Sequence, residues 1–214
     1  MLIRQYKPSD RSAIEEIQFN TYFLGKPMSE FVSSRAPFSA ELAHYFEEPK
    51  STFVAEDKGK VVGYLIGCLD DSKHDKKLFY VKSDIKNFIK SFSLPKKDRA
   101  YWRARVVFLF QVMLGKSGEL KLKTPKGAGH LHINLLSSAR GGGVGSKLLK
   151  TFFKYAKKKG VKIIHADSFQ TRINPNKNFW IKNGFEEYSK VKTLFWKKQL
   201  PEEEIFYVCY VKKL

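Results

Sequence analysis

The sequence has only two cysteines in 214 residues, Cys68 and Cys209. Each lies inside an apolar run, and the pair has neither CxxC spacing nor the spacing of metal ligands. These features exclude a disulfide scaffold and a cysteine-based metal site. We expect two buried free thiols in a reducing compartment.

Long apolar stretches are also missing. No run approaches the roughly 20 apolar residues that a membrane span requires, and the opening MLIRQYKPSD has no apolar signal-peptide core. We therefore expect a cytoplasmic protein with no membrane partner. Because 43% of the residues are hydrophobic, the chain can bury a substantial core, and we expect one globular domain over residues 1–214.

Acidic residues are much fewer than basic residues. The chain has 21 Asp and Glu against 40 Lys and Arg, which gives a formal net charge of +19. Such a charge is typical of nucleic-acid-binding proteins and of enzymes with acidic acceptors. It is equally typical of lysines spread over solvated faces, because the lysines form no dominant block. Both interpretations stay open.

Apolar periodicity and turn residues predict an alternation of strands and helices. The segment from about 70 to 126 interrupts this order and is interpreted as an insertion. Its run VVFLFQVML is either a buried helix or a buried strand. We expect strands at about 2–6, 51–57, 60–69, 130–136, 161–167, 192–198 and 204–214, and helices at about 11–23, 39–48, 144–159 and 176–184.

Four glycines within five residues follow the strand HLHINLL, in the stretch SSARGGGVGSKLL. A glycine-rich turn from a strand into a helix directs free backbone N–H groups at one point, which makes a phosphate site. The nucleoside-triphosphate loop is excluded, because Gly145 is followed by Ser146 and only then by Lys147. The dinucleotide fingerprint is excluded too, since Ser146 takes the place of its third glycine.

A third pattern, [QR]-x-x-G-x-[GA], is satisfied by Arg140, Gly143 and Gly145. With it the chain resembles the GNAT superfamily of acetyl-CoA-dependent N-acetyltransferases. The hairpin strand VVGYLIG, the helix KNFWIKNGFEE and the two closing strands follow in the family's order, and the insertion at 70–126 lies outside the resemblance. Within the superfamily, the chain is similar to the acetyltransferase-like domain of O-GlcNAc hydrolases.

The resemblance implies an α/β (α+β) fold with a mixed central sheet, a splayed pair of strands, flanking helices and a helical insertion. It also implies acetyl-CoA as cosubstrate and no metal. Backbone groups at 133–135 would contact the pantetheine arm, and the amides of the glycine loop would hold the pyrophosphate. The implied cofactor contacts are Ile133, Asn134, Leu135, Arg140, Gly141, Gly142, Gly143, Val144, Gly145, Ser146 and Asn174.

Acyl transfer to an amine requires a base, and the run HLHIN offers two candidates. His130 and His132 alternate onto one face of the strand with Asn134, and histidine titrates near neutral pH. The run resembles that of serotonin N-acetyltransferases, in which two such histidines relay protons. Asp167, at the end of the next strand, is a further candidate base. An equally good interpretation is that both histidines are structural and form hydrogen bonds with neighbouring backbone groups.

The acid that protonates the leaving thiolate is a tyrosine in many GNAT proteins, and here that position is Trp180. Tyr155 and Tyr188 are substitutes only if the fold brings them near the sulfur. Where the family has an asparagine, this chain has Ile173, with Asn174 one step along.

Three functions follow from these features. We favour transfer of an acetyl group from acetyl-CoA to a small amine or amino sugar. The alternatives are an acyl-CoA-binding module without catalysis, and a basic nucleic-acid-associated protein. We expect the acceptor groove between the first two helices and the loop joining the last two strands. The insertion either covers that groove or forms a homodimer interface, so the protein is a monomer or a homodimer.

Overall fold

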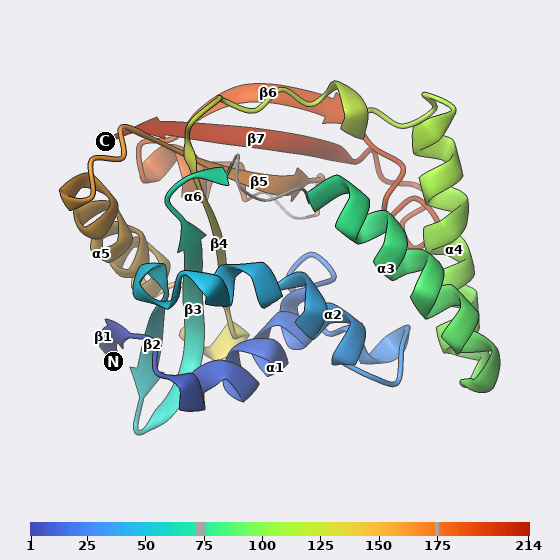
Figure 1. The fold of residues 1–214 in the computed structure, drawn as a ribbon, viewed down its shortest axis with the longest axis horizontal. Coiled ribbons are helices and arrows are strands. Elements are labelled where there is room, and N and C mark those ends of the chain that lie inside the picture. The colour runs from blue at the N-terminus through green and yellow to red at the C-terminus, as the bar shows by residue number, and fades with distance from the viewer. Residues whose placement is uncertain (72–75, 174–175) are drawn as a thin grey trace.

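The computed structural model describes residues 1–71, 76–173 and 176–214. Its centre is a seven-stranded sheet in the order β1-β2-β3-β4-β5-β7-β6 (Figure 1). All neighbouring strands are antiparallel except β4 and β5, which are parallel. The strands are β1 Leu2–Gln5, β2 Phe53–Asp57, β3 Lys60–Cys68, β4 Gly129–Leu135, β5 Ile163–Gln170, β6 Glu186–Lys192 and β7 Phe206–Lys213.

Helices cover both faces of the sheet, because successive strand residues point to opposite faces. Leu65 of β3 lies in the core beneath α5 and α6, whereas Tyr64 and Ile66 lie in the core beneath α1. This mixed sheet between helices confirms the predicted fold class. The helices are α1 Arg11–Thr21, α2 Ala36–Glu41, α3 Lys76–Lys90, α4 Lys96–Met113, α5 Val144–Lys158 and α6 Lys177–Lys182.

The helix after the glycine loop, α5, forms as its periodicity predicts. Its apolar stripe is at most 4% exposed, and the lysines between the stripe residues face solvent. Gly160 follows the helix with φ +81°, a left-handed conformation that glycine adopts without strain. The buried stripe comprises Val144, Leu148, Leu149, Phe152 and Ala156.

The insertion is helical, and its run VVFLFQVML belongs to α4. Helices α3 and α4 form a hairpin at one end of the molecule (Figure 1). A buried ion pair joins them, with Arg105 Nη2 2.8 Å from Asp84 Oδ2. Trp102, Arg105 and Phe108 are buried at helical spacing, which explains why this apolar run is a helix.

Two sequence predictions of secondary structure are wrong. The run KTLFWKK does not form a strand: β6 ends at Lys192, and residues 193–199 form a loop. Trp196, 1% exposed, packs against Phe23 and Phe169, so these apolar side chains anchor a loop instead of alternating across a sheet. The predicted helix at 39–48 is instead α2, with Pro37 in its first turn, and a separate 3-10 turn at Ala43–Glu47.

Both cysteines are buried free thiols, as expected. Among the helices in the described ranges, none combines the length and the apolar character that crossing a membrane requires.

Candidate functional site

The two parallel strands β4 and β5 diverge early. They pair at only two positions, Gly129 with Ile164 and His130 with His165. Beyond these pairs β4 continues along β3, and β5 continues along β7. The sheet is therefore splayed at the point where His130 lies, which is the geometry that the resemblance implied.

The divergence leaves one edge of β4 facing the opening. The Leu136 N–H donates to the Val62 carbonyl at 2.9 Å, so the backbone groups of even-numbered β4 residues point toward β3. By strand alternation, the N–H and C=O groups of Ile133 and Leu135 point toward β5. The backbone N–H and C=O groups of Asn134 point toward β3, and its side chain points toward α1.

The glycine loop presents donors in front of α5. Gly143 is the N-cap of this helix, with φ +73°. The Lys147 N–H donates to the Gly143 carbonyl at 3.0 Å and closes the first turn. The amides of Val144, Gly145 and Ser146 precede it, in the turn where a helix offers N–H groups no carbonyl four residues back. The positive end of the helix dipole lies at the same place.

The glycines of the loop have two different roles. A Cβ atom at Gly141, Gly142 or Gly143 would have no heavy atom within 4 Å, so an anion can approach the backbone there. A Cβ atom at Gly145 would lie 2.9 Å from the Phe179 ring. The first three glycines therefore keep the loop open, and the fourth lets α5 pack against α6.

Arg140 ties the loop to its surroundings. Its Nε donates to the Leu135 carbonyl at 3.0 Å, and its Nη2 donates to the Gly25 carbonyl, also at 3.0 Å. Its backbone N–H donates to the Ser137 carbonyl at 3.2 Å. These bonds fix the loop between the end of β4 and the turn after α1.

His132 belongs to a buried polar network that sequence reasoning missed. The Tyr64 hydroxyl, fully buried, donates to Gln18 Oε1 at 2.6 Å and lies 3.1 Å from His132 Nδ1. The Asn134 side-chain amide donates to Gln18 Oε1 at 2.9 Å and to the Tyr64 hydroxyl at 3.1 Å. The network joins α1, β3 and β4.

This network fixes the tautomer of His132. A tyrosine hydroxyl carries one proton, and that of Tyr64 is directed to Gln18. Burial raises the pKa of Tyr64 far above its usual range, so the hydroxyl keeps this proton. The Tyr64 oxygen therefore accepts a hydrogen bond from His132 Nδ1–H, which makes Nε2 the basic nitrogen of the neutral ring.

His130 and Asp167 belong to a second network. His130 Nδ1 lies 2.5 Å from the Tyr45 hydroxyl, and its Nε2 lies 3.8 Å from Asp167 Oδ2. His165 lies between two carboxylates, 3.4 Å from Asp167 and 3.3 Å from Asp71. Burial lowers the pKa of His165, but its hydrogen bonds to the two carboxylates outweigh this and raise it to about 9. At neutral pH His165 is therefore a cation that holds Asp167 in place.

Three of these residues have the spacing of metal ligands. His130, His165 and Asp167 each offer one ligand atom, and these atoms lie within 4.8 Å of one another. However, both ring nitrogens of His165 face carboxylates, which favours a proton there over a metal ion. The expected absence of a metal stays a prediction.

A carboxyl group from α2 lies within electrostatic reach of the Tyr64 network. Glu41 Oε1 accepts a hydrogen bond from the Tyr22 hydroxyl at 3.0 Å. Burial raises the pKa of Glu41 to about 7, although the charge of Arg105 opposes this. The charge of Glu41 in turn contributes to the raised pKa of Tyr64.

Comparison with solved structures identifies the fold. SsHAT matches with a TM-score of 0.63 and 23% identity, covering 99% of this chain and 97% of that one. The polyamine N-acetyltransferase of Drosophila melanogaster matches with a TM-score of 0.58 and 12% identity, covering 100% of this chain and 99% of that one. The protein yncA of Salmonella typhimurium, solved with acetyl-CoA as its cofactor, matches with a TM-score of 0.57 and 15% identity, covering 100% of this chain and 94% of that one. The chain has the GNAT fold.

No protein-family model and no curated protein matches the sequence. The resemblance to GNAT acetyltransferases is confirmed at the level of the fold, and the similarity to O-GlcNAc hydrolases stays a prediction.

The position where many GNAT proteins have a catalytic tyrosine is filled by a core residue. Trp180 is 5% exposed and packs against Phe185. The suggested substitutes lie elsewhere: Tyr155 packs against Phe53 of β2, and Tyr188 is 53% exposed on the edge strand β6. The structure therefore does not bring either tyrosine to His132.

The GNAT asparagine position also differs. Ile173 is 53% exposed, and Asn174, the expected cofactor contact, lies outside the described residues. Asn176 donates to Ser168 Oγ at 2.5 Å and to the Phe169 carbonyl at 2.9 Å, so it ties the start of α6 to the end of β5.

The expected acceptor groove is partly closed. Trp196 of the loop between β6 and β7 packs against Tyr22 and Phe23, which follow α1. A cavity of about 430 Å³ lies between residues 194–199 of this loop and α4. The insertion thus borders the loop.

Proposed function

We propose that this protein is a GNAT N-acetyltransferase that moves the acetyl group of acetyl-CoA to the amine of a small molecule. One observation carries the proposal: His132, whose tautomer is set by its contact with Tyr64, lies on β4 just beyond the point where β4 diverges from β5. The glycine loop stands at the end of the same strand. One strand thus connects an anion site with a base.

The residues present fit coenzyme A. The unpaired amides of α5 and the open loop at 141–143 suit its pyrophosphate, because several N–H groups and the helix dipole favour negative charge without a metal. The exposed edge of β4 at Ile133 and Leu135 suits the amides of its pantetheine arm. A neighbouring structure, yncA, was solved with acetyl-CoA as its cofactor, which supports this assignment.

His132 supplies the base. Acetyl-CoA, when bound, provides an activated thioester, and the acceptor nitrogen must lose a proton as its bond to carbon forms and the carbon–sulfur bond breaks. His132 Nε2 takes that proton, and coenzyme A leaves as a thiolate that takes a proton from the imidazolium or from solvent to become the free thiol. Tyr64 holds the ring so that Nδ1–H stays bonded, and Gln18 and Asn134 hold Tyr64.

The test is an acetylation assay with acetyl-CoA and a panel of small amines and amino sugars, which detects the free thiol of coenzyme A. His132→Ala should lower turnover by about 10² to 10⁴, the usual contribution of a general base. Acetyl-CoA affinity, measured by isothermal titration, should change less than threefold.

Other outcomes distinguish the alternatives. Binding of acetyl-CoA without turnover of any amine would indicate an acyl-CoA-binding module. Failure to bind acetyl-CoA, with an affinity for RNA that falls steeply with salt, would indicate a nucleic-acid-binding protein. An unchanged rate in His132→Ala would remove His132 from the proposed mechanism.

A further inference from the structure

The insertion exposes an unusual amount of apolar surface. Of the fourteen exposed large hydrophobic residues among those described, nine lie between residues 85 and 120. Ile89 is 64% exposed and Phe92 61% at the turn end of α3, and Phe110 is 60% and Met113 75% exposed on α4. Ile85, Ile89 and Phe92 lie within eight residues of one another, and exposed apolar side chains gathered in this way mark an interaction site. Phe110 and Met113 lie at the opposite end of α4, away from the turn.

The same hairpin exposes charge of one sign only. Eight lysines and arginines between residues 82 and 118 are exposed. Both acidic residues of this range are buried: Asp84, 3% exposed, pairs with Arg105, and Asp98, 1% exposed, accepts hydrogen bonds from Ser33. The exposed surface of residues 82–118 therefore carries apolar groups and positive charges, with no exposed carboxylate between them.

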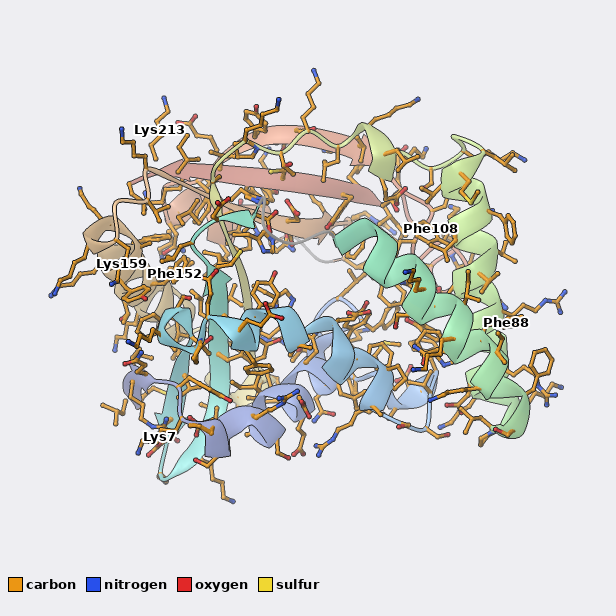
Figure 2. The ribbon with its side chains drawn as sticks, in the orientation of Figure 1. Lys7, Phe88, Phe108, Phe152, Lys159 and Lys213 are labelled. Carbon is orange, nitrogen blue, oxygen red and sulfur yellow. The ribbon has the colours of Figure 1, made fainter. Side chains whose placement is uncertain are left out.

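The two kinds of side chain are interleaved along α3. Ile85, Ile89 and Phe92 recur at spacings of four and three residues, and Lys86 and Lys90 stand next to the first two. The hairpin, on which Phe88 and Phe108 are labelled, stands at one end of the molecule, far from Lys159 and Lys213 (Figure 2).

We propose that the hairpin of α3 and α4 docks this protein on a membrane surface that contains anionic lipids. Exposed apolar side chains beside lysines are the pattern of helices that lie at the interface between water and lipid. Anionic headgroups attract the lysines, and the apolar side chains enter the boundary below the headgroups. This contact is peripheral and differs from a membrane span, and it replaces the sequence-based expectation of no membrane partner.

Other occupants fit the surface less well. A second copy of the chain would bring eight positive charges against eight more, and like charges in contact oppose association. A nucleic acid would match the lysines but would leave Ile89 and Phe92 in water or against phosphates. The combination of charge and apolar exposure selects a lipid surface.

The test is flotation of the full chain with vesicles of phosphatidylcholine, with and without phosphatidylserine. Binding should require phosphatidylserine. Lys86→Glu with Lys90→Glu should weaken it by at least about 30-fold, since each lysine near an anionic surface contributes about fivefold and the two factors multiply. The matched control is Lys154→Glu with Lys158→Glu, which changes the net charge equally at the exposed face of α5 and should cost less than threefold.

A second variant tests the apolar contribution. Phe92→Ser alters an exposed side chain, so it should leave folding and acetylation unchanged while lowering vesicle binding about tenfold. The proposal is overturned if no vesicle is bound, or if both lysine pairs have equal effects and Phe92→Ser has none. It is also overturned if the hairpin variants instead abolish a dimer in sedimentation or reduce binding to RNA alone.

Discussion

Replacing Gly142 by aspartate should separate folding from cofactor binding at the glycine loop. A Cβ atom at this position meets no heavy atom within 4 Å, and Gly142 is not among the glycines with positive φ. The fold therefore accepts the side chain. A carboxylate just before α5 also interacts favourably with the helix dipole, so the free energy of unfolding should stay equal or rise by about 0.3–1 kcal/mol.

Cofactor binding should change in the opposite direction. Two unit charges about 5 Å apart repel by roughly 0.8 kcal/mol in water and roughly 3 kcal/mol at an effective dielectric constant near 20. A pyrophosphate presents two negative charges, so acetyl-CoA affinity should fall by at least about 30-fold, or about 2 kcal/mol. The loss should diminish as salt is added, because salt screens exposed charges.

Isothermal titration with acetyl-CoA and chemical denaturation of the same samples measure the two effects. Gly142→Asn is the matched control, since it has nearly the same shape without the charge. If Gly142→Asp and Gly142→Asn bind acetyl-CoA equally well, the pyrophosphate does not lie against this loop. Substitutions at Gly143 or Gly145 are less informative, because positive φ at the first and the Phe179 ring at the second would disturb folding.

Two further predictions concern stability. Gly145→Ala should destabilise the fold by about 1–3 kcal/mol, because the new methyl group would lie 2.9 Å from the Phe179 ring; Phe179→Leu in the same chain should recover part of the loss in denaturant unfolding. His165 has a folded pKa of about 9 against 6.5 in the unfolded chain, so its stabilising contribution is complete below pH 6.5 and is lost as the pH rises through 9. Denaturation at several pH values should show this decline, up to about 3 kcal/mol, and Asp71→Asn should flatten it; a flat profile in the unmodified protein would contradict the assignment.

Most of the order of strands and helices, and the open glycine turn that starts α5, could be predicted from sequence because local features determine them. In α5 the apolar residues repeat with the helical period and Gly160 follows its last turn. At the loop, the glycines directly precede the helix in sequence. Their spacing alone therefore distinguishes the GNAT pattern from the nucleoside-triphosphate and dinucleotide patterns. These features need no knowledge of distant contacts.

The partners of the histidines could not be predicted, because they depend on register between strands that are far apart in sequence. Alternation places His132 on a face of β4, but it does not say that Asn134 stands opposite Tyr64 of β3. In the sequence, Tyr64 is one aromatic residue in an apolar strand, and Gln18 is one polar residue in a helix. Only the packing of α1 over both strands brings them together.

The loop at 193–199 differs from the predicted strand for a related reason. Leu194, Phe195 and Trp196 are apolar, and such runs are common in buried strands. Here Phe195 lies 4.2 Å below the Arg105 guanidinium of α4, and Trp196 packs against Phe23. These apolar residues contact the insertion and the segment that follows the first helix, and no local sequence pattern predicts such distant contacts.

The early divergence of β4 and β5 has a consequence for the dynamics of the sheet. An edge whose N–H groups face an opening instead of a neighbouring strand exchanges its amide hydrogens readily with solvent. On the proposed function, the pantetheine arm occupies the place of the missing strand segment, and the amides of Ile133 and Leu135 become protected. Bound acetyl-CoA would then pair with this edge of β4 as an eighth strand would. Local opening of the sheet would decrease, and the order of the protein's own strands would not change.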